Sequence, residues 1–507
     1  MRTPVALDGH SLTLDDVVAV ANGAVVELAP MARVRMERAN DVVTALVAGT
    51  AVAYGVTTGF GKLSDVAIPR DRLDELQVNL VRSHAAGVGA LLPEREVRAM
   101  MLLRANVIAK GYSGARPLLV DLLVGMLNAH VYPPIPEQGS VGASGDLAPL
   151  AHLALALIGE GDLFRGGDRG DAATMLAGVG LAPARLGPKE GITLINGTQA
   201  HTAIAALGVV DAHRLWQVAH LAGAMTLEAL LGTPVAFDPR IQDVRGQLGQ
   251  AASAALLRSL LQESEIRESH RDNDPRVQDP YALRCMPQVH GPVLDAIDFC
   301  AGVIGRELNA ATDNPLVFAD TGELLSGGNF HGQAVAMALD FMAIALTNLA
   351  TMSERRIDRL VHPDLNQGLP PFLTSDAGVN SGFMMAQVTA ASLASECKVL
   401  SHPASVDTIP TDGNKEDVVP MAMGAAWKLR RIVQNVRHVL AIELMCAAQG
   451  LDYRKPLRAG RGAEQGQRLV RQLVAPLGQD RVLSTDIATL ARAIEQGHFT
   501  AGVGGSA

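Results

Sequence analysis

Three long stretches of the chain favour long helices, and this feature constrains the fold most strongly. Residues 198–232 contain no proline, and residues 332–362 contain neither proline nor glycine after Gly332. A third stretch runs from about residue 421 to residue 450. The segment that begins at Gln333 is apolar on more than one helical face, which is typical of a helix buried in a bundle. The sequence therefore predicts a mainly α fold, built as a bundle of long helices.

The first 200 residues carry shorter patterns than the rest of the chain. Residues 5–7 favour a short strand, and Thr13 with Asp16 can form a capping box at the start of a helix. We therefore expect a small N-terminal α/β part. The expected division is an N-terminal domain over residues 1–200 and a long helical bundle with C-terminal helices over residues 201–507.

Two segments interrupt the helical pattern of the N-terminal part. A polar loop with three glycines spans residues 54–65. Glycine permits positive φ angles, so this loop has the composition of a segment that moves. Residues 131–136 contain three prolines, which remove backbone donors and exclude a helix there.

Composition and charge limit the kinds of partner that the chain can bind. The 507 residues carry a formal net charge of −9, whereas nucleic acids and anionic membranes attract clustered Lys and Arg. No run of about 18 apolar residues predicts a transmembrane helix, and the N-terminus lacks the apolar core of a signal peptide. The four cysteines form no CxxC pair, which favours reduced thiols. We expect a cytoplasmic protein with no nucleic-acid or membrane partner.

The most informative segment is Gly139–His152, which reads GSVGASGDLAPLAH. Taken by itself, it is a turn-rich loop that leads into a helix. Asp146 has the right residue type to cap that helix, and Pro149 suits its first turn. An isolated Ala-Ser-Gly triplet carries no information, but the whole fourteen-residue string does.

This string closely resembles the signature of the histidine, phenylalanine and tyrosine ammonia-lyases and their aminomutase relatives. The resemblance implies the aspartase/fumarase-like long-helix bundle of these enzymes. It also implies that Ala143, Ser144 and Gly145 cyclise and dehydrate into a methylidene-imidazolone group, with no external cofactor and no metal. Gly145 offers an unhindered backbone nitrogen, and Ser144 loses water to leave an exocyclic methylene. Difficult eliminations need an electron sink, which is normally a separate cofactor.

Further blocks resemble the family in the expected order over nearly the whole chain. The loop that begins at Tyr54 looks like the family's mobile loop, in which a tyrosine takes the β-proton of the substrate. The ordinary phenol pKa is about 10, so this role requires a lowered pKa or close coupling to the electrophile. Asn196 matches an asparagine that hydrogen-bonds near the prosthetic group and the substrate.

The later blocks match the substrate-binding residues of the family. Arg284 would pair with the substrate carboxylate through two hydrogen bonds, which a lysine does less well. Tyr281 would lie beside the amine, and Gln278 would help to orient the reacting groups. Asn314 and Phe330 would line the pocket. Each motif alone is weak evidence for the resemblance, but their occurrence together in the family's order is strong evidence.

Four residues resemble the histidine-specific members of the family. The pair Ser83-His84 stands at the selectivity position, where an imidazole can bind the imidazole of a substrate directly. Glu416 matches a carboxylate that holds the ring N–H and assists proton removal, and Met384 matches a pocket methionine. The resemblance therefore implies elimination of ammonia from L-histidine to give trans-urocanate.

Two departures from the family pattern lie beside Glu416. Lys415 replaces the usual glutamine, so it can pair with Glu416 or favour an anionic group on the substrate. Pro420 deletes a backbone donor. A modified histidine, tyrosine or phenylalanine thus stays open as substrate, as does a 2,3-aminomutase outcome.

Two other classes of protein are rivals to this interpretation. A fumarase- or aspartase-type lyase shares the long-helix core, but its Gly-Ser-Ser…Met-Pro…Lys-x-Asn loop is absent from the sequence. An inactive helical homologue is disfavoured because Tyr54, Ser144, Asn196, Tyr281 and Arg284 are intact. Long helices of this kind often continue their packing between subunits, and the resemblance implies a homotetramer with shared active sites.

Overall fold

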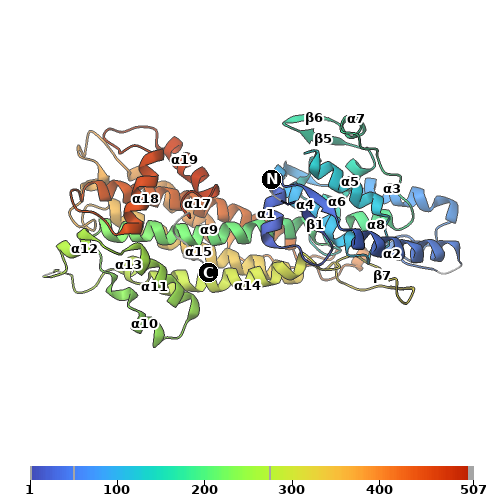
Figure 1. Cartoon of the computed structure of the whole chain (residues 1–507), viewed down its shortest axis with the longest axis horizontal. Coiled ribbons are helices and arrows are strands. Elements are labelled where there is room, and N and C mark those ends of the chain that lie inside the picture. Colours follow the sequence, from blue (N-terminus) through green and yellow to red (C-terminus); the bar gives the residue numbers. More distant parts are fainter. Residues whose placement is uncertain (1–2, 50–51, 273, 275, 501–507) are drawn as a thin grey trace. The chain divides into compact units, whose positions relative to one another are not determined.

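The computed structural model describes residues 3–500, apart from residues 50, 51, 273 and 275. The fold is mainly α, as predicted, and two compact units can be distinguished in the chain (Figure 1). Unit 1 contains residues 1–207, 301–340 and 403–427, and unit 2 contains residues 208–300, 341–402 and 428–507.

All three predicted long helices are present. They are α9 (Gln199–Ala229), α15 (Gln333–Val361) and α17 (Ala422–Asp452), and each begins within about a residue of its predicted start. A fourth long helix, α14, spans Met286–Glu307. Each of the four contributes residues to both units. The absence of proline from α9, α15 and α17 and their many alanines and leucines explain this length, because these residues favour helices.

The other helices of unit 1 are shorter. They are α1 (Leu14–Ala21), α2 (Pro30–Ala48), α3 (Leu73–His84), α4 (Glu94–Ala109), α5 (Pro117–Asn128), α6 (Leu147–Leu157), α7 (Ala172–Ala177) and α8 (Glu190–Ile195). The predicted capping box of α1 is confirmed, since the Thr13 side chain accepts from the Asp16 amide and the Asp16 carboxylate accepts from the Thr13 amide. Helix α4 is buried on all sides and packs against α1, α2 and α5.

Four two-stranded sheets belong to unit 1. The predicted strand is β1 (Val5–Leu7), which pairs in parallel with β2 (Val26–Leu28). The antiparallel pairs are β3 (Val88–Leu91) with β4 (Pro136–Gln138), β5 (Asp162–Arg165) with β6 (Asp168–Asp171), and β7 (Leu316–Phe318) with β8 (Glu323–Leu325). The proline-rich segment thus leads into a strand rather than a helix.

Three helices of unit 1 pack against one another and form one wall of the cavity described below. Helices α3, α6 and α8 contact each other pairwise. The buried Gln77 of α3 joins two of them, because its side-chain oxygen accepts a hydrogen bond from the Gly191 amide of α8 at 2.9 Å. The C-terminal end of α3 carries His84, and the N-terminal end of α6 follows the Ala-Ser-Gly triplet.

Unit 2 is built around a buried ion pair between helices α15 and α17. The Arg356 guanidinium donates to both carboxylate oxygens of Glu443, at 2.5 and 2.9 Å, and neither side chain is exposed. Thr226 of α9 and Ser353 of α15 donate to the same carboxylate, at 2.9 and 2.6 Å. The Arg356 guanidinium also lies 3.3 Å from the His290 ring of α14. Every long helix therefore contributes to one polar cluster inside unit 2.

Unit 2 also contains α-helices that are shorter than these four. They are α10 (Pro239–Asp243), α11 (Leu248–Leu260), α12 (Glu265–Ser269), α13 (Tyr281–Arg284), α16 (Met384–Leu400), α18 (Arg461–Leu473) and α19 (Leu483–Glu495).

Helix α15 is the one helix of the described residues that is long and apolar enough to cross a membrane. Its most apolar window has a mean hydropathy of 1.6, but 67% of that window is buried inside the protein. Such burial is typical of a core helix in a bundle.

Candidate active site

The Ala-Ser-Gly triplet lies in a backbone arrangement that only glycine permits at its third position. Gly145 has a φ angle of +72°, and a Cβ atom built on it would lie 2.1 Å from the carbonyl oxygen of Gly197. Gly145 pairs with Gly197 in a parallel bridge, and the Asp146 amide donates to the Gly197 carbonyl at 2.7 Å. The triplet is thus held against the turn that precedes α9.

Asp146 occupies the N-cap position of α6, but the prediction that its side chain caps this helix is wrong. One carboxylate oxygen accepts instead from the amides of Ala200 and His201, at 2.8 and 2.9 Å, near the start of α9. The His201 ring nitrogen lies 2.8 Å from the same oxygen, and Ser140 donates to the other. Burial by itself raises the pKa of Asp146, but the charge and hydrogen bonds of His201 and the hydrogen bond of Ser140 together outweigh it, so the net pKa is lowered. The positive end of a helix macrodipole also favours a carboxylate there.

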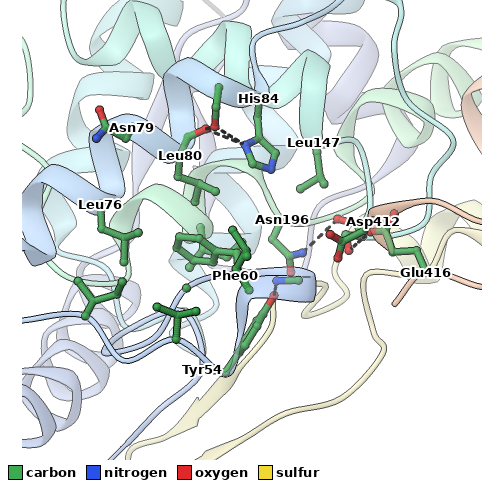
Figure 2. A pocket seen from close by; sticks show the side chains of 18 residues that line it. Tyr54, Phe60, Leu76, Asn79, Leu80, His84, Leu147, Asn196, Asp412 and Glu416 are labelled. Carbon is green, nitrogen blue, oxygen red and sulfur yellow. Dashed lines mark hydrogen bonds between the residues drawn. The ribbon is translucent and has the colours of Figure 1, made fainter. Parts of the chain in front are cut away.

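The Ser144 side chain points toward a carboxylate from a distant part of the chain. Its hydroxyl donates to Oε1 of Glu416 at 2.5 Å, and the Thr411 hydroxyl donates to Oε2 at the same distance. The Asn196 side-chain amide donates to the Ser144 carbonyl at 3.1 Å. The contacts of Ser144 with Glu416 and Asn196 appear as dashed lines in Figure 2. The structure thus brings three predicted site residues together.

Lys415 does not neutralise this carboxylate. Over the residues that the structure describes, no ion pair joins Lys415 to Glu416, whose two oxygens accept from hydroxyl groups. The exposed Lys415 lines a neighbouring cavity instead.

The triplet and Asn196 fit the prosthetic group that the family signature implies. Gly145 has no Cβ where any side chain would collide with Gly197, which leaves its backbone nitrogen unhindered. Within the described part of the chain, Oδ1 of Asn196 is buried and has no hydrogen-bond partner. A buried acceptor of this kind normally has a donor, so a group or substrate that donates there would satisfy it.

Tyr54 lies in the glycine-containing loop and faces the same site. Its hydroxyl oxygen accepts a hydrogen bond from the Gly61 amide at 3.1 Å, and its ring packs edge-to-face with Phe60. Burial raises the pKa of Tyr54, the Gly61 hydrogen bond opposes this, and the charges of Asp412 and Glu416 raise it further. The structure therefore gives no lowered phenol pKa in the free chain.

Two neighbouring cavities of unit 1 share Tyr54, Ser144 and Glu416. The larger has a volume of about 620 Å³ and is walled by apolar side chains of α3, α6 and α8. Its size lies within the usual range for small-molecule sites, about 300–1,000 Å³. The smaller, of about 350 Å³, is lined by Ala143, Phe330 and Lys415, among others.

His84 lines the larger cavity with one ring nitrogen committed elsewhere. Its Nδ1 lies 2.8 Å from the Leu80 carbonyl and 3.0 Å from the Ser83 hydroxyl, which itself donates to the Leu80 carbonyl (Figure 2). A carbonyl can only accept, so the hydrogen bond to Leu80 places the proton on Nδ1. The neutral ring then offers Nε2 as an acceptor to a ligand.

Asn314 belongs to unit 1 but is not among the residues that line the two cavities. Its side-chain oxygen accepts from the Gly327 amide at 2.9 Å, and a cis peptide bond joins it to Pro315.

Four predicted site residues belong to unit 2. Gln278 and Tyr281 are exposed, and the Arg284 guanidinium lies over the Tyr281 ring, 4.6 Å from its centroid. Met384 is the first residue of α16 and is partly exposed. Their roles stay predictions.

Sequence reasoning missed several residues that shape the site. Arg104 of α4 is fully buried and donates to the Asn196 carbonyl at 2.8 Å, and burial lowers its pKa to about 10. Thr411 and Asp412 contact Glu416 and the Tyr54 loop. No local sequence pattern predicts a role for Arg104. The residues Asp412-Gly413-Asn414 are typical of turns, so they do predict an irregular segment.

The fold and this site define a class of mainly helical protein in which an Ala-Ser-Gly triplet lies in the loop before a helix. The sequence model of the family described as "Aromatic amino acid lyase" matches residues 12–472, and the chain belongs to this family. A histidine ammonia-lyase of Anaeromyxobacter sp. (strain K) is 55% identical over 500 residues, which cover 97% of this chain and 98% of that protein.

Solved structures are similar over the whole chain. The histidine ammonia-lyase of Trypanosoma cruzi is 43% identical, with a TM-score of 0.91, and the match covers 99% of this chain and 95% of that one. The tyrosine aminomutase of Streptomyces globisporus is 37% identical, with a TM-score of 0.94, and the match covers 99% and 98%. The predicted family and the predicted fold class are thereby confirmed.

Proposed function

We propose that this chain is a histidine ammonia-lyase, which eliminates ammonia from L-histidine to give trans-urocanate. The observation that carries the proposal is the meeting of Ser144, Tyr54, His84 and Glu416 around one cavity of about 620 Å³. The full-length relatives at about 55% identity support the same substrate.

We propose that Ala143, Ser144 and Gly145 form the methylidene-imidazolone group, which supplies an electrophilic methylene as electron sink. The Gly145 nitrogen bonds to the Ala143 carbonyl carbon, and the Ala143 carbonyl oxygen leaves as water. A second water leaves when Ser144 loses its hydroxyl and its α-proton. Asn196 and Gly197 hold this segment through the Ser144 carbonyl and the Asp146 amide.

Tyr54 is assigned as the base that takes the β-proton. Its phenol must lose its proton first, and the Gly61 amide favours the phenolate by donating to its oxygen. The substrate ring would donate its N–H to Nε2 of His84. Glu416 is assigned to the ring or to proton removal, because its oxygens have only exchangeable hydroxyl donors among the described residues.

The remaining contacts of the substrate are assigned by the resemblance to the family. We assign the substrate carboxylate to Arg284, whose planar guanidinium suits two parallel hydrogen bonds, and we assign orientation to Tyr281 and Gln278. Met384, Asn314 and Phe330 are proposed to complete the pocket. We further propose a cytoplasmic homotetramer with shared sites; size-exclusion chromatography with light scattering measures this assembly directly.

The decisive experiment offers the purified protein a panel of histidine, methylated histidines, tyrosine and phenylalanine. Near-UV absorbance follows the unsaturated acid, and intact mass reports whether two waters have been lost from the chain. We expect turnover of histidine and the reduced mass. Rapid turnover of tyrosine with none of histidine overturns the assignment of His84.

The same experiment separates the remaining alternatives. A β-amino acid among the products would identify an aminomutase, to which the structural likeness to the tyrosine aminomutase also extends. An unreduced mass with no turnover would identify an inactive homologue.

A further inference from the structure

The segment that carries Glu416 has an unusual backbone beside the Tyr54 loop. Three consecutive residues, Asp412, Gly413 and Asn414, have left-handed φ angles of 48°, 58° and 69°. Aspartate and asparagine tolerate this conformation at a cost in free energy, and such costs concentrate at functional sites. The turn is closed by a hydrogen bond from the Thr411 amide to the Glu416 carbonyl. This geometry turns the Asp412 side chain toward the loop.

The Asp412 carboxylate packs directly on the loop backbone. Its Oδ1 accepts from the Lys62 amide at 3.2 Å, inside the short 3-10 helix Gly61–Leu63. A Cβ atom built on Gly61 would lie only 2.0 Å from Oδ2 of Asp412, so a side chain at Gly61 would displace the carboxylate. The Gly61 amide donates to the Tyr54 hydroxyl. Two successive loop amides therefore donate to the site: Gly61 to the Tyr54 hydroxyl and Lys62 to the Asp412 carboxylate.

The charges around the Tyr54 phenol are mainly negative. Asp412 and Glu416 come from the 411–416 segment and raise the Tyr54 pKa, in addition to the effect of burial. The shared or adjoining cavities also present Lys415, Asp417 and His331, and His84 faces the larger cavity from α3. Among these described groups, Asp412 alone hydrogen-bonds to the backbone of the Tyr54 loop.

We propose that Asp412 is a positioning residue, which clamps the Tyr54 loop through the Lys62 amide and places a negative charge beside the phenol. This inference rests on the proposed function, in which Tyr54 is the base. The clamp fixes where the phenol oxygen lies. The charge sets the pH above which the phenol can act, because a nearby negative charge disfavours the phenolate.

Two variants separate the clamp from the charge. Asp412→Asn keeps an oxygen that accepts from Lys62 but removes the charge, whereas Asp412→Ala removes both. Asp407→Asn is the matched control, since it removes an exposed charge just before this segment, on a carboxylate that accepts from the Thr408 amide. Hydrogen exchange of residues 60–64 and the pH dependence of kcat are measured for the intact enzyme. Intact mass and thermal midpoint check maturation and folding.

For Asp412→Ala we expect about fivefold faster exchange in the loop, the size that one lost hydrogen bond predicts. For both variants we expect the rising limb of the kcat profile to move to lower pH by roughly half a unit. Asp412→Asn should keep wild-type exchange, and Asp407→Asn should change neither quantity.

Unchanged exchange in Asp412→Ala overturns the clamp, and an unmoved profile in Asp412→Asn overturns the charge effect. Failure of the proposed function looks different, because the wild-type protein would then turn over none of the amino acids in the panel. The exchange measurement still tests the clamp in that case, since it needs no turnover.

Discussion

Two buried or half-buried carboxylates, Glu443 in unit 2 and Glu416 in unit 1, are satisfied in different ways. Glu443 accepts two hydrogen bonds from a guanidinium and two from hydroxyl groups, all within regular helices. Among the described residues, Glu416 accepts only from hydroxyl groups, and it follows a left-handed turn. A carboxylate fixed by a permanent cation serves packing, whereas one held by exchangeable hydroxyl protons remains available for chemistry.

Two histidines, His220 in unit 2 and His84 in unit 1, differ in a similar way in how fully their ring nitrogens are hydrogen-bonded. His220 in unit 2 is fully buried, with its ring nitrogens 2.7 Å from the Trp216 carbonyl and 2.6 Å from the Ser253 hydroxyl. His84 in unit 1 lines a cavity, and within the part of the chain that the structure describes only its Nδ1 is hydrogen-bonded. Changes at His84 and Glu416 should therefore alter catalysis with little loss of stability, and changes at His220 and Glu443 should do the reverse.

The largest expected effect is on catalysis, from Ser144→Ala in unit 1. The variant cannot form the methylene, so turnover of histidine should fall by about a thousandfold or more, the scale seen when a reacting group is removed. Intact mass should show that the second water is no longer lost, and the thermal midpoint should stay close to wild type. Near-wild-type turnover would falsify the proposed chemistry.

The largest expected effect on stability comes from Arg356→Met in unit 2. Glu443 would be left buried without its cation, which costs about 3–5 kcal/mol. Chemical denaturation measures the loss. Arg431→Met is the control on α17, because the side chains of Arg431 and its partner Glu396 are 49% and 39% exposed and such a surface pair contributes about 0–1 kcal/mol. Equal losses of unfolding free energy in the two variants would show that the buried pair stabilises the fold no more than an exposed pair does.

Acid should weaken unit 2 through His220. Burial lowers its folded-state pKa to about 3, against an ordinary value of 6.5. The unfolded chain therefore binds the proton first as the pH falls, so stability is full above about pH 6.5 and is lost progressively toward pH 3. Between pH 7 and pH 5 the loss should be about 2 kcal/mol from this residue. Denaturation of His220→Gln across this range should show a weaker pH dependence; an identical slope contradicts the assignment.

The smallest expected effect is that of His84→Leu on the specificity of unit 1. One lost hydrogen bond to the substrate ring predicts about a tenfold lower kcat/KM for histidine. Steady-state kinetics measure this, with Ser83→Ala as a control that leaves the imidazole in place and should change less. A variant that keeps full kcat/KM for histidine would show that His84 does not bind the ring.

Local sequence signals account for the parts of the fold that were predicted. The boundaries of α15 and the capping box of α1 follow from residues within a few positions of one another. The side chain of Asp146 was assigned wrongly because its true partners, at 200 and 201, lie on another helix. The contact between Lys62 and Asp412 joins residues 350 positions apart, which no local pattern can express. The division at residue 200 stays a prediction.

The contact between Ser144 and Glu416 has a consequence for biosynthesis. The two residues are 272 positions apart, so the triplet leaves the ribosome long before its partner is made. At about 5–20 residues per second, the interval is roughly 15 to 50 s. The Asn196–Gly197 turn that holds the triplet is also synthesised later. During this time the contacts that hold the triplet in the folded chain are not yet made. Under the proposed function, an electrophile that forms only in the folded site would therefore appear when the chain can already enclose it, and cellular thiols would meet no electrophile on the nascent chain.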